Sequence, residues 1–208
     1  MNFEILLVTE NKNKLKEFRE ILSPYGIIVY SVTDLNLPKV EIEENGKDYF
    51  ENALIKANAY KSFVPFPILA DDSGIEVEAM NNKPGIFSAR FAANMGGHSN
   101  AIKEILSKTK DNNKARFVCE LALLNLEDKP LRFTGITNGI ISPIAKGDNG
   151  FGYDPIFIPE GFNKTFSELD EVSKNKASHR GKAIIKLLTY LKINNLVTIH
   201  KHKGHDDK

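Results

Sequence analysis

Two adjacent aspartates directly follow a short apolar run near the centre of the chain. Residues 68–70 are Ile-Leu-Ala, and Asp71, Asp72, Ser73 and Gly74 come next. An apolar run of this length between turn-forming residues is typical of a buried strand, so we expect the strand to end at the aspartates. Successive strand residues point to opposite faces, so one carboxylate can enter a cleft while the other fixes the backbone. The pattern predicts a metal ligand or general base, and a strand-ending Asx turn is the alternative.

The composition is that of an ordinary globular protein and argues against a disulfide-bonded, membrane or nucleic-acid-binding protein. The chain has 208 residues, 41% hydrophobic and 26% charged, so it can bury a substantial core. A formal net charge of +1 gives no general attraction for nucleic acid. The single cysteine, Cys119, excludes an internal disulfide. Because the chain shows neither a signal peptide nor an apolar run of membrane-spanning length, we expect a cytoplasmic protein without membrane or nucleic-acid partners.

A strand, a polar loop and an amphipathic helix are predicted at the start of the chain. Residues 4–9 have the pattern of a buried strand, and the loop that follows carries Thr9, Asn11 and Lys14. A polar loop entering a helix offers free N–H groups to an anion, and a lysine in the first turn adds positive charge. We therefore expect a phosphate-binding loop here, with an ordinary surface lysine as the alternative.

An acidic segment precedes the next predicted helix. It contains Glu43 and Glu44, and Asp48 stands where it can cap the helix that carries Lys56. Magnesium in proteins prefers one or two carboxylates together with phosphate oxygens. The segment therefore predicts a carboxylate for the same metal as Asp72, and a solvated acidic loop is the alternative.

A glycine-rich turn follows a predicted hairpin of residues 115–126 and 129–138. Phe151 lies between two glycines of this turn, and Tyr153 and Asp154 come directly after it. Glycines allow close backbone approach to a ligand, and an aromatic side chain there can stack on a nucleotide base. A turn with a core aromatic residue is the alternative.

Two helices are predicted near the end of the chain. Residues 167–172 are a short helix candidate, and Ser178 is placed to cap a longer final helix. His179 and Arg180 occupy the first turn of that final helix, where the helix dipole disfavours cations. Their position predicts an anionic or hydrogen-bonding partner.

Taken in order, these segments resemble the inosine-triphosphate pyrophosphatase family, enzymes that remove non-canonical purine nucleoside triphosphates. The resemblance runs from Ile5 to about Leu191. Its motifs are Thr9-x-Asn11-x-x-Lys14, Glu43-Glu44-x-Gly46, Glu51-Asn52-Ala53-x-x-Lys56-Ala57, Ala70-Asp71-Asp72-Ser73-Gly74, Pro84-Gly85-x-x-Ser88-Ala89-Arg90, Phe151-Gly152-Tyr153-Asp154-Pro155-x-Phe157 and Ser178-His179-Arg180.

The resemblance implies an α/β fold with a long, curved mixed sheet and two lobes around a central cleft. It implies one domain over residues 1–193 and a homodimer. The polar composition of residues 194–208 separately predicts a tail that is disordered at its end. The implied reaction is Mg²⁺-dependent hydrolysis of ITP, dITP or XTP to the monophosphate and pyrophosphate. A non-catalytic nucleotide-binding module is the alternative, and it would not need the carboxylates.

The resemblance also implies roles for the matching residues. Asp72 corresponds to the proton acceptor and a metal ligand, Lys56 acts beside it, and Glu43 or Glu44 supplies the other metal carboxylate. The positions implied to bind substrate are Thr9, Asn11, Lys14, Ser73, Phe151, Gly152, Tyr153, Asp154, Lys174, His179 and Arg180.

Base selection is expected to depend on hydrogen-bond donors. Hypoxanthine and xanthine carry a 6-oxo acceptor, whereas adenine carries a 6-amino donor. Arg180 has only donors, and His179 or a backbone N–H near Phe151 can also donate. A pocket with donors at position 6 should accept ITP and XTP and disfavour ATP.

Overall fold

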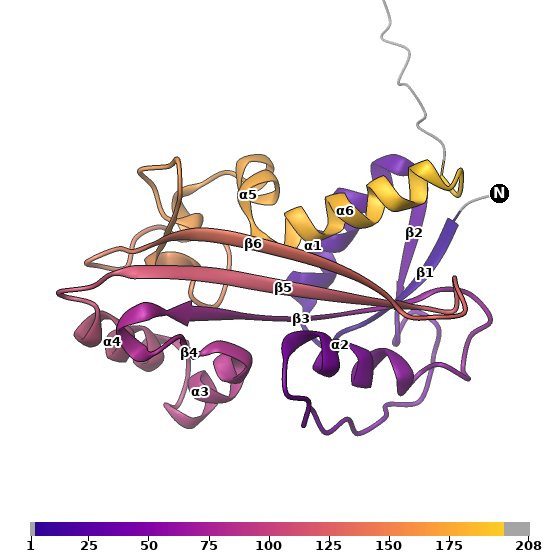
Figure 1. Ribbon diagram of the computed structural model, residues 1–208, viewed down its shortest axis with the longest axis horizontal. Coiled ribbons are helices and arrows are strands. Elements are labelled where there is room, and N and C mark those ends of the chain that lie inside the picture. The colour runs from indigo at the N-terminus through magenta and orange to yellow at the C-terminus, as the bar shows by residue number, and fades with distance from the viewer. Residues whose placement is uncertain (1–2, 198–208) are drawn as a thin grey trace, which may run out of the picture.

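One mixed sheet of seven strands forms the centre of the molecule, and helices cover both of its faces (Figure 1). The computed structural model describes residues 3–197. The strands are β1 (Phe3–Val8), β2 (Ile27–Ser31), β3 (Ile68–Val77), β4 (Lys83–Pro84), β5 (Lys114–Leu124), β6 (Leu131–Ile141) and β7 (Phe157–Pro159). The α-helices are α1 (Lys12–Leu22), α2 (Tyr49–Asn58), α3 (Ser88–Asn94), α4 (His98–Lys108), α5 (Glu171–Ala177) and α6 (His179–Ile193). Short 3-10 turns cover Ser23–Tyr25, Glu78–Met80, Gly85–Phe87, Asp154–Ile156 and Phe166–Glu168.

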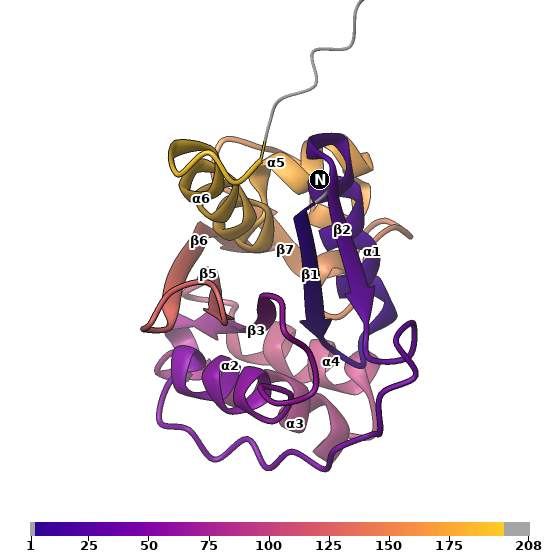
Figure 2. The ribbon, with the colours of Figure 1, turned by 90° about the vertical axis from the view of Figure 1, so that its right-hand side faces the viewer.

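The strand order explains why the sheet is mixed. Neighbouring strands follow the order β2-β1-β3-β5-β6-β7, and the short β4 pairs with β3. β1 runs parallel to β2 and β3, whereas the pairs from β3 onward to β7 are antiparallel. In Figure 1 the long strands β3, β5 and β6 lie between α1, α5 and α6 on one side and α2, α3 and α4 on the other. Figure 2 shows the same layering from one end. The predicted α/β fold with a mixed sheet is confirmed.

The prediction that a strand ends at Asp71 and Asp72 is wrong. β3 continues through both aspartates to Val77, because β5 pairs with it along its whole length and places Leu121 and Glu120 opposite the two aspartates. Gly74 does not turn the chain here. A Cβ atom at Gly74 would lie 2.1 Å from the carbonyl oxygen of Gly85, so this glycine allows a neighbouring turn to pack directly on the strand.

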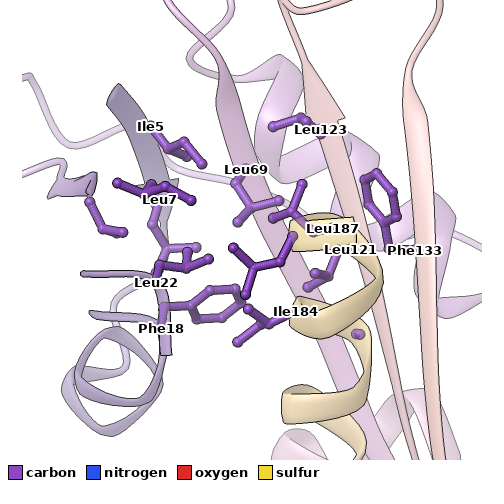
Figure 3. Close-up of a cluster of buried hydrophobic side chains, with 14 of the residues drawn as sticks. Ile5, Leu7, Phe18, Leu22, Leu69, Leu121, Leu123, Phe133, Ile184 and Leu187 are labelled. Atoms are coloured by element: carbon purple, nitrogen blue, oxygen red, sulfur yellow. The ribbon is translucent and has the colours of Figure 1, made fainter. Parts of the chain in front are cut away.

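The two faces of β3 pack into different cores, which fixes where each aspartate points. Leu69 belongs to the core between the sheet and helices α1 and α6, shown in Figure 3. Ile68 and Ala70 belong to the core beneath α2. Because strand residues alternate between faces, Asp71 shares the α1 and α6 face with Leu69, and Asp72 shares the α2 face with Ala70.

Several local predictions are confirmed and one helix was misplaced. Asp48 and Ser178 cap α2 and α6, where their side chains accept backbone hydrogen bonds. The predicted hairpin is formed by β5 and β6. The helix predicted at 167–172 is wrong, because that stretch holds a 3-10 turn and then Asp170, which caps α5 instead.

None of the helices in residues 3–197 is long and apolar enough to cross a membrane. Most of the predicted polar tail, residues 198–208, lies outside the described residues.

Candidate active site

The phosphate loop predicted from the sequence lies between β1 and α1. Asn11 caps α1, and its Oδ1 atom accepts from the backbone N–H groups of Asn13 and Lys14. The N–H of Asn11 donates to Oγ1 of Thr9 at 3.1 Å. The Nζ atom of Lys14 lies 2.8 Å from Oδ2 of Asp71. Thr9, Asn11 and Lys14 are therefore brought together at the end of β1, next to one of the two central aspartates.

Asp71 is a buried anion held by two cations. Its side chain is 1% exposed, and the guanidinium of Arg180 approaches its Oδ2 atom at 3.4 Å beside Lys14. Burial alone would raise the pKa of Asp71, but the positive charges of Lys14 and Arg180 hold it well below its usual range. Asp71 is therefore ionised at neutral pH and already paired within the protein.

Alternating charges continue from Asp71 through the interior towards the glycine-rich turn. Arg180 donates to Glu17 at 2.6 Å, Glu17 accepts from Lys174 at 2.8 Å, and Lys174 reaches Asp154 at 2.8 Å. Arg180 also donates to Oγ of Ser73 at 3.0 Å. The chain of contacts links α1 and the predicted phosphate loop before it to the region around Phe151.

Burial and charge act against each other within this cluster. Burial would raise the pKa of Glu17, but Arg180 and Lys174 lower it below its ordinary value. Burial would lower the pKa of Lys174, but Asp154 and Glu17 raise it. For Asp154, burial prevails and raises the pKa despite Lys174. The cluster keeps its charges only because they are mutually paired.

The glycine-rich turn is built around Asp154. The N–H of Phe151 donates to its Oδ2 atom at 2.8 Å, and a Cβ atom at Gly150 would lie 2.3 Å from the same oxygen. Gly150 has φ +78°, which a glycine adopts readily. Nζ of Lys174 and Cζ of Arg180 lie 4.8 and 5.6 Å from the centre of the Phe151 ring. Phe151 is thus fixed to the charge cluster by its backbone and its ring.

The two residues after Phe151 connect the turn to the far side of the sheet. Gly152 has φ +65° and lies near the ring of His98. Tyr153 is buried, and its hydroxyl donates to the carbonyl of Ser88 at 2.8 Å. These contacts place the turn against α3 and α4.

His179 and Arg180 are both buried and make their contacts inside the protein. The His179 ring stacks on Phe117 with centroids 4.5 Å apart. Burial lowers the pKa of His179 well below its usual range, so the imidazole is neutral at pH 7. Its Nδ1 atom has no hydrogen-bond partner within residues 3–197. The anions predicted for the first turn of α6 are supplied to Arg180 by Glu17 and Asp71.

Asp72 lies on the opposite face of β3 and meets α2. Its Oδ2 atom accepts from Nδ2 of Asn52 at 3.2 Å, and its Oδ1 atom lies 3.7 Å from Nζ of Lys56. The same ammonium lies 3.1 Å from Oε2 of Glu44. Glu44 is further held by Arg90, which donates to its backbone carbonyl. Glu43 is exposed, so the contacts of the acidic loop with the site are made by Glu44.

The electrostatics around Asp72 differ from those around Asp71. Burial raises the pKa of Asp72 despite the opposing charges of Lys56 and Lys14. Burial would lower the pKa of Lys56, but Asp72, Asp71 and Glu44 raise it. A carboxylate with a raised pKa is a stronger base than an ordinary one, which suits a proton acceptor.

The pair of carboxylates fits a magnesium ion shared with a substrate. Glu44 and Asp72 converge on one ammonium group, so their oxygens approach the same region. Magnesium is commonly bound by one or two carboxylates plus phosphate oxygens. In residues 3–197 no group of three or more His, Cys, Asp or Glu side chains is arranged to hold a metal by itself.

Two residues of this arrangement were missed from the sequence. Glu17 stands three positions after Lys14, and Asn52 stands four positions before Lys56. Residues with these spacings share one face of a helix, so both could have been expected to point where the lysines point.

The chain is similar to known proteins over nearly its whole length. The model of the Ham1 family matches residues 5–190. A dITP/XTP pyrophosphatase of Aquifex aeolicus is 40% identical over 200 residues, covering 91% of this chain and 96% of that protein. The dITP/XTP pyrophosphatase of Dictyoglomus thermophilum is 41% identical over 192 residues, covering 90% and 93%.

Solved structures show the same relationship. The structure of a HAM1 protein from Coxiella burnetii matches with a TM-score of 0.79 and 36% identity, covering 92% of this chain and 99% of that one. The Ham1 protein of Staphylococcus aureus matches with a TM-score of 0.80 and 34% identity, with the same coverage. The family expected from the sequence motifs is thereby confirmed, and this chain belongs to the Ham1 family.

Proposed function

We propose that this protein hydrolyses non-canonical purine nucleoside triphosphates to the monophosphate and pyrophosphate. Its relatives are named dITP/XTP pyrophosphatases, and they match it over nearly their whole length. The observation that carries the proposal is the surroundings of Asp72, a carboxylate of raised pKa that lies against Lys56 and near Glu44. A binding module would not need this basic carboxylate.

In the proposed mechanism Asp72 accepts the proton of the water that attacks the α-phosphorus. Lys56 and Lys14 supply positive charge on the two sides of β3, where a polyphosphate needs neutralisation. A Mg²⁺ ion held by Glu44 and Asp72 would neutralise the phosphates further when bound. Phe151 is the surface on which the base stacks, in the predicted cleft between the lobes.

The remaining expectations belong to the same proposal. We propose that the protein is a homodimer, that it works in the cytoplasm on free nucleotides, and that it does not bind nucleic acid. The resemblance supports the first point, and the near-neutral net charge supports the third.

The function is tested by measuring pyrophosphate release. With Mg²⁺ and equal concentrations of ITP, dITP, XTP and ATP, we expect release of pyrophosphate from the first three and much less from ATP. Phosphorus NMR should show the monophosphate and pyrophosphate as the products. A nucleoside diphosphate with orthophosphate would contradict the proposed bond cleavage, and binding without any product would favour the binding module.

Replacing Phe151 by Ala should weaken purine binding. Stacking on an aromatic side chain contributes about 1–3 kcal/mol per base, so KM should rise by roughly 5- to 150-fold. Steady-state kinetics with ITP check this, and Phe162→Ala, which changes an exposed phenylalanine, is the control. An unchanged KM in Phe151→Ala would exclude stacking on this ring.

The structure changes the effect on activity and stability that we expect from Arg180→Ala. From the sequence, loss of its donors is expected to lower kcat/KM for ITP more than for ATP. In the structure the guanidinium bonds Glu17, Asp71 and Ser73, so its removal takes one of two cationic partners from each of two buried carboxylates. We therefore expect a lower melting temperature and similar losses on both nucleotides. A selective loss on ITP in a stable variant would restore the base-contact role.

A further inference from the structure

The amide of Asn52 bridges the two elements that carry Glu44 and Asp72, the carboxylates proposed to hold the metal. Asn52 is 0% exposed. Its Oδ1 atom accepts from the N–H of Gly46 at 2.8 Å, two residues after Glu44 on the acidic loop. Its Nδ2 atom donates to Oδ2 of Asp72 on β3 at 3.2 Å. One buried side chain therefore connects the acidic loop with the central strand.

Helix α2 directs both oxygens of Asp72. Asn52 and Lys56 are one helical turn apart, so they share a face of α2. Asn52 meets Oδ2, and Lys56 lies 3.7 Å from Oδ1. Side chains of α2 therefore contact both oxygens of Asp72 and fix the orientation of its carboxylate.

The acidic loop is held equally closely at the other end of the amide. A Cβ atom at Gly46 would lie 2.7 Å from Oδ1 of Asn52 and 2.8 Å from its backbone nitrogen. A glycine is therefore required for the loop to approach α2 at this depth. The approach brings Glu44 to 3.1 Å from Lys56, the residue that also faces Asp72.

Only a side chain with both a donor and an acceptor makes these two contacts. The amide of asparagine supplies one of each. Leucine has a similar volume but makes neither bond, so it would leave Asp72 and the Gly46 N–H without their buried partner. The chemistry of the position is matched to holding a carboxylate in a fixed place.

We infer that Asn52 is a positioning residue that fixes the separation between the Glu44 and Asp72 carboxylates and so sets the affinity of this site for a divalent cation. The inference rests on the proposed function, because that function places the cation between these carboxylates. Removing a hydrogen-bond partner of a ligating carboxylate typically costs about 10–100-fold in metal affinity.

The test uses Mn²⁺ alone as the probe and needs no turnover. Free Mn²⁺ is measured by electron paramagnetic resonance while the full-length protein is titrated. We expect Asn52→Leu and Gly46→Ala each to raise the Mn²⁺ dissociation constant by about tenfold or more. Asn58→Leu, an exposed asparagine on the same helix, should bind as the wild type does.

Thermal melts recorded in parallel separate positioning from a merely structural role. Lower melting temperatures with unchanged Mn²⁺ affinity would overturn the inference, as would a wild-type protein without a saturable Mn²⁺ site. If Asn52→Leu does not fold, the Mn²⁺ affinity of Gly46→Ala, which changes the acidic loop instead, decides whether the inference holds. A wild-type protein that binds Mn²⁺ in an Asn52-dependent way but releases no pyrophosphate would contradict the proposed function and leave this inference standing.

Discussion

Replacing Asp72 by Asn should lower kcat by about 10²- to 10⁴-fold, the usual cost of losing a general base. The protein should stay folded. The pKa of Asp72 is raised in the folded state, so the folded protein binds this proton more tightly than the unfolded chain does. At neutral pH the charged group therefore works against folding, and its removal should leave the melting temperature unchanged or higher.

Asp71→Asn is the matched change one residue earlier. We expect it to lower kcat less than Asp72→Asn does, and to lower the melting temperature. Asp71 has a lowered pKa and pairs with Lys14 and Arg180, so its charge stabilises the fold at neutral pH. Breaking a buried ion pair costs about 3–5 kcal/mol, which corresponds to a fall of roughly 6–20 °C in melting temperature for a chain of this size. Kinetics at saturating Mg²⁺ and thermal melts on both variants test the assignment. Equal losses of kcat and equal melting temperatures would show that the two roles are divided wrongly.

Replacing Glu17 by Gln should also lower the free energy of unfolding by about 3–5 kcal/mol, because Lys174 and Arg180 both lose their shared anion. Glu20→Gln is the control on the same helix. Its carboxylate pairs with Lys16 nearer the surface, where an ion pair contributes about 0–1 kcal/mol.

The same variant should change the pH dependence of stability. The pKa of Glu17 is lowered in the folded state, so its stabilisation is complete above the pKa of an unfolded glutamate, about 4.3, and is lost as pH falls further. Between pH 5 and pH 2 the wild type should therefore lose more stability than Glu17→Gln. Urea unfolding across this range measures both effects. Parallel pH profiles would show that Glu17 is not ionised and paired as the structure indicates.

Local patterns predicted the elements around the site well. Asp48 and Ser178 are each predicted to cap a helix, and each does so. These predictions succeed because a cap depends only on residues within one turn. The motifs on those elements were also close enough to a known family to indicate the fold and the reaction.

Contacts between distant segments could not be predicted in this way. The apolar run at 68–70 stops at Asp71, yet β3 continues because β5, about fifty residues later, pairs beyond it. The partners of Arg180 lie on α1 and β3, so its sequence position indicated a missing anion without indicating that the protein provides it. Glu17 and Asn52 share helix faces with Lys14 and Lys56, but the residues that they contact lie on other elements of the fold.

Hydrolysis in water enriched in ¹⁸O tests the central claim most directly, because it reports which phosphorus the water attacks. ITP is incubated with the protein and Mg²⁺, the products are separated, and their ¹⁸O content is measured by mass spectrometry. If Asp72 activates water for attack at the α-phosphorus, the label appears in the monophosphate, and the pyrophosphate stays unlabelled. Label in pyrophosphate or orthophosphate, with none in the monophosphate, would contradict the proposed reaction.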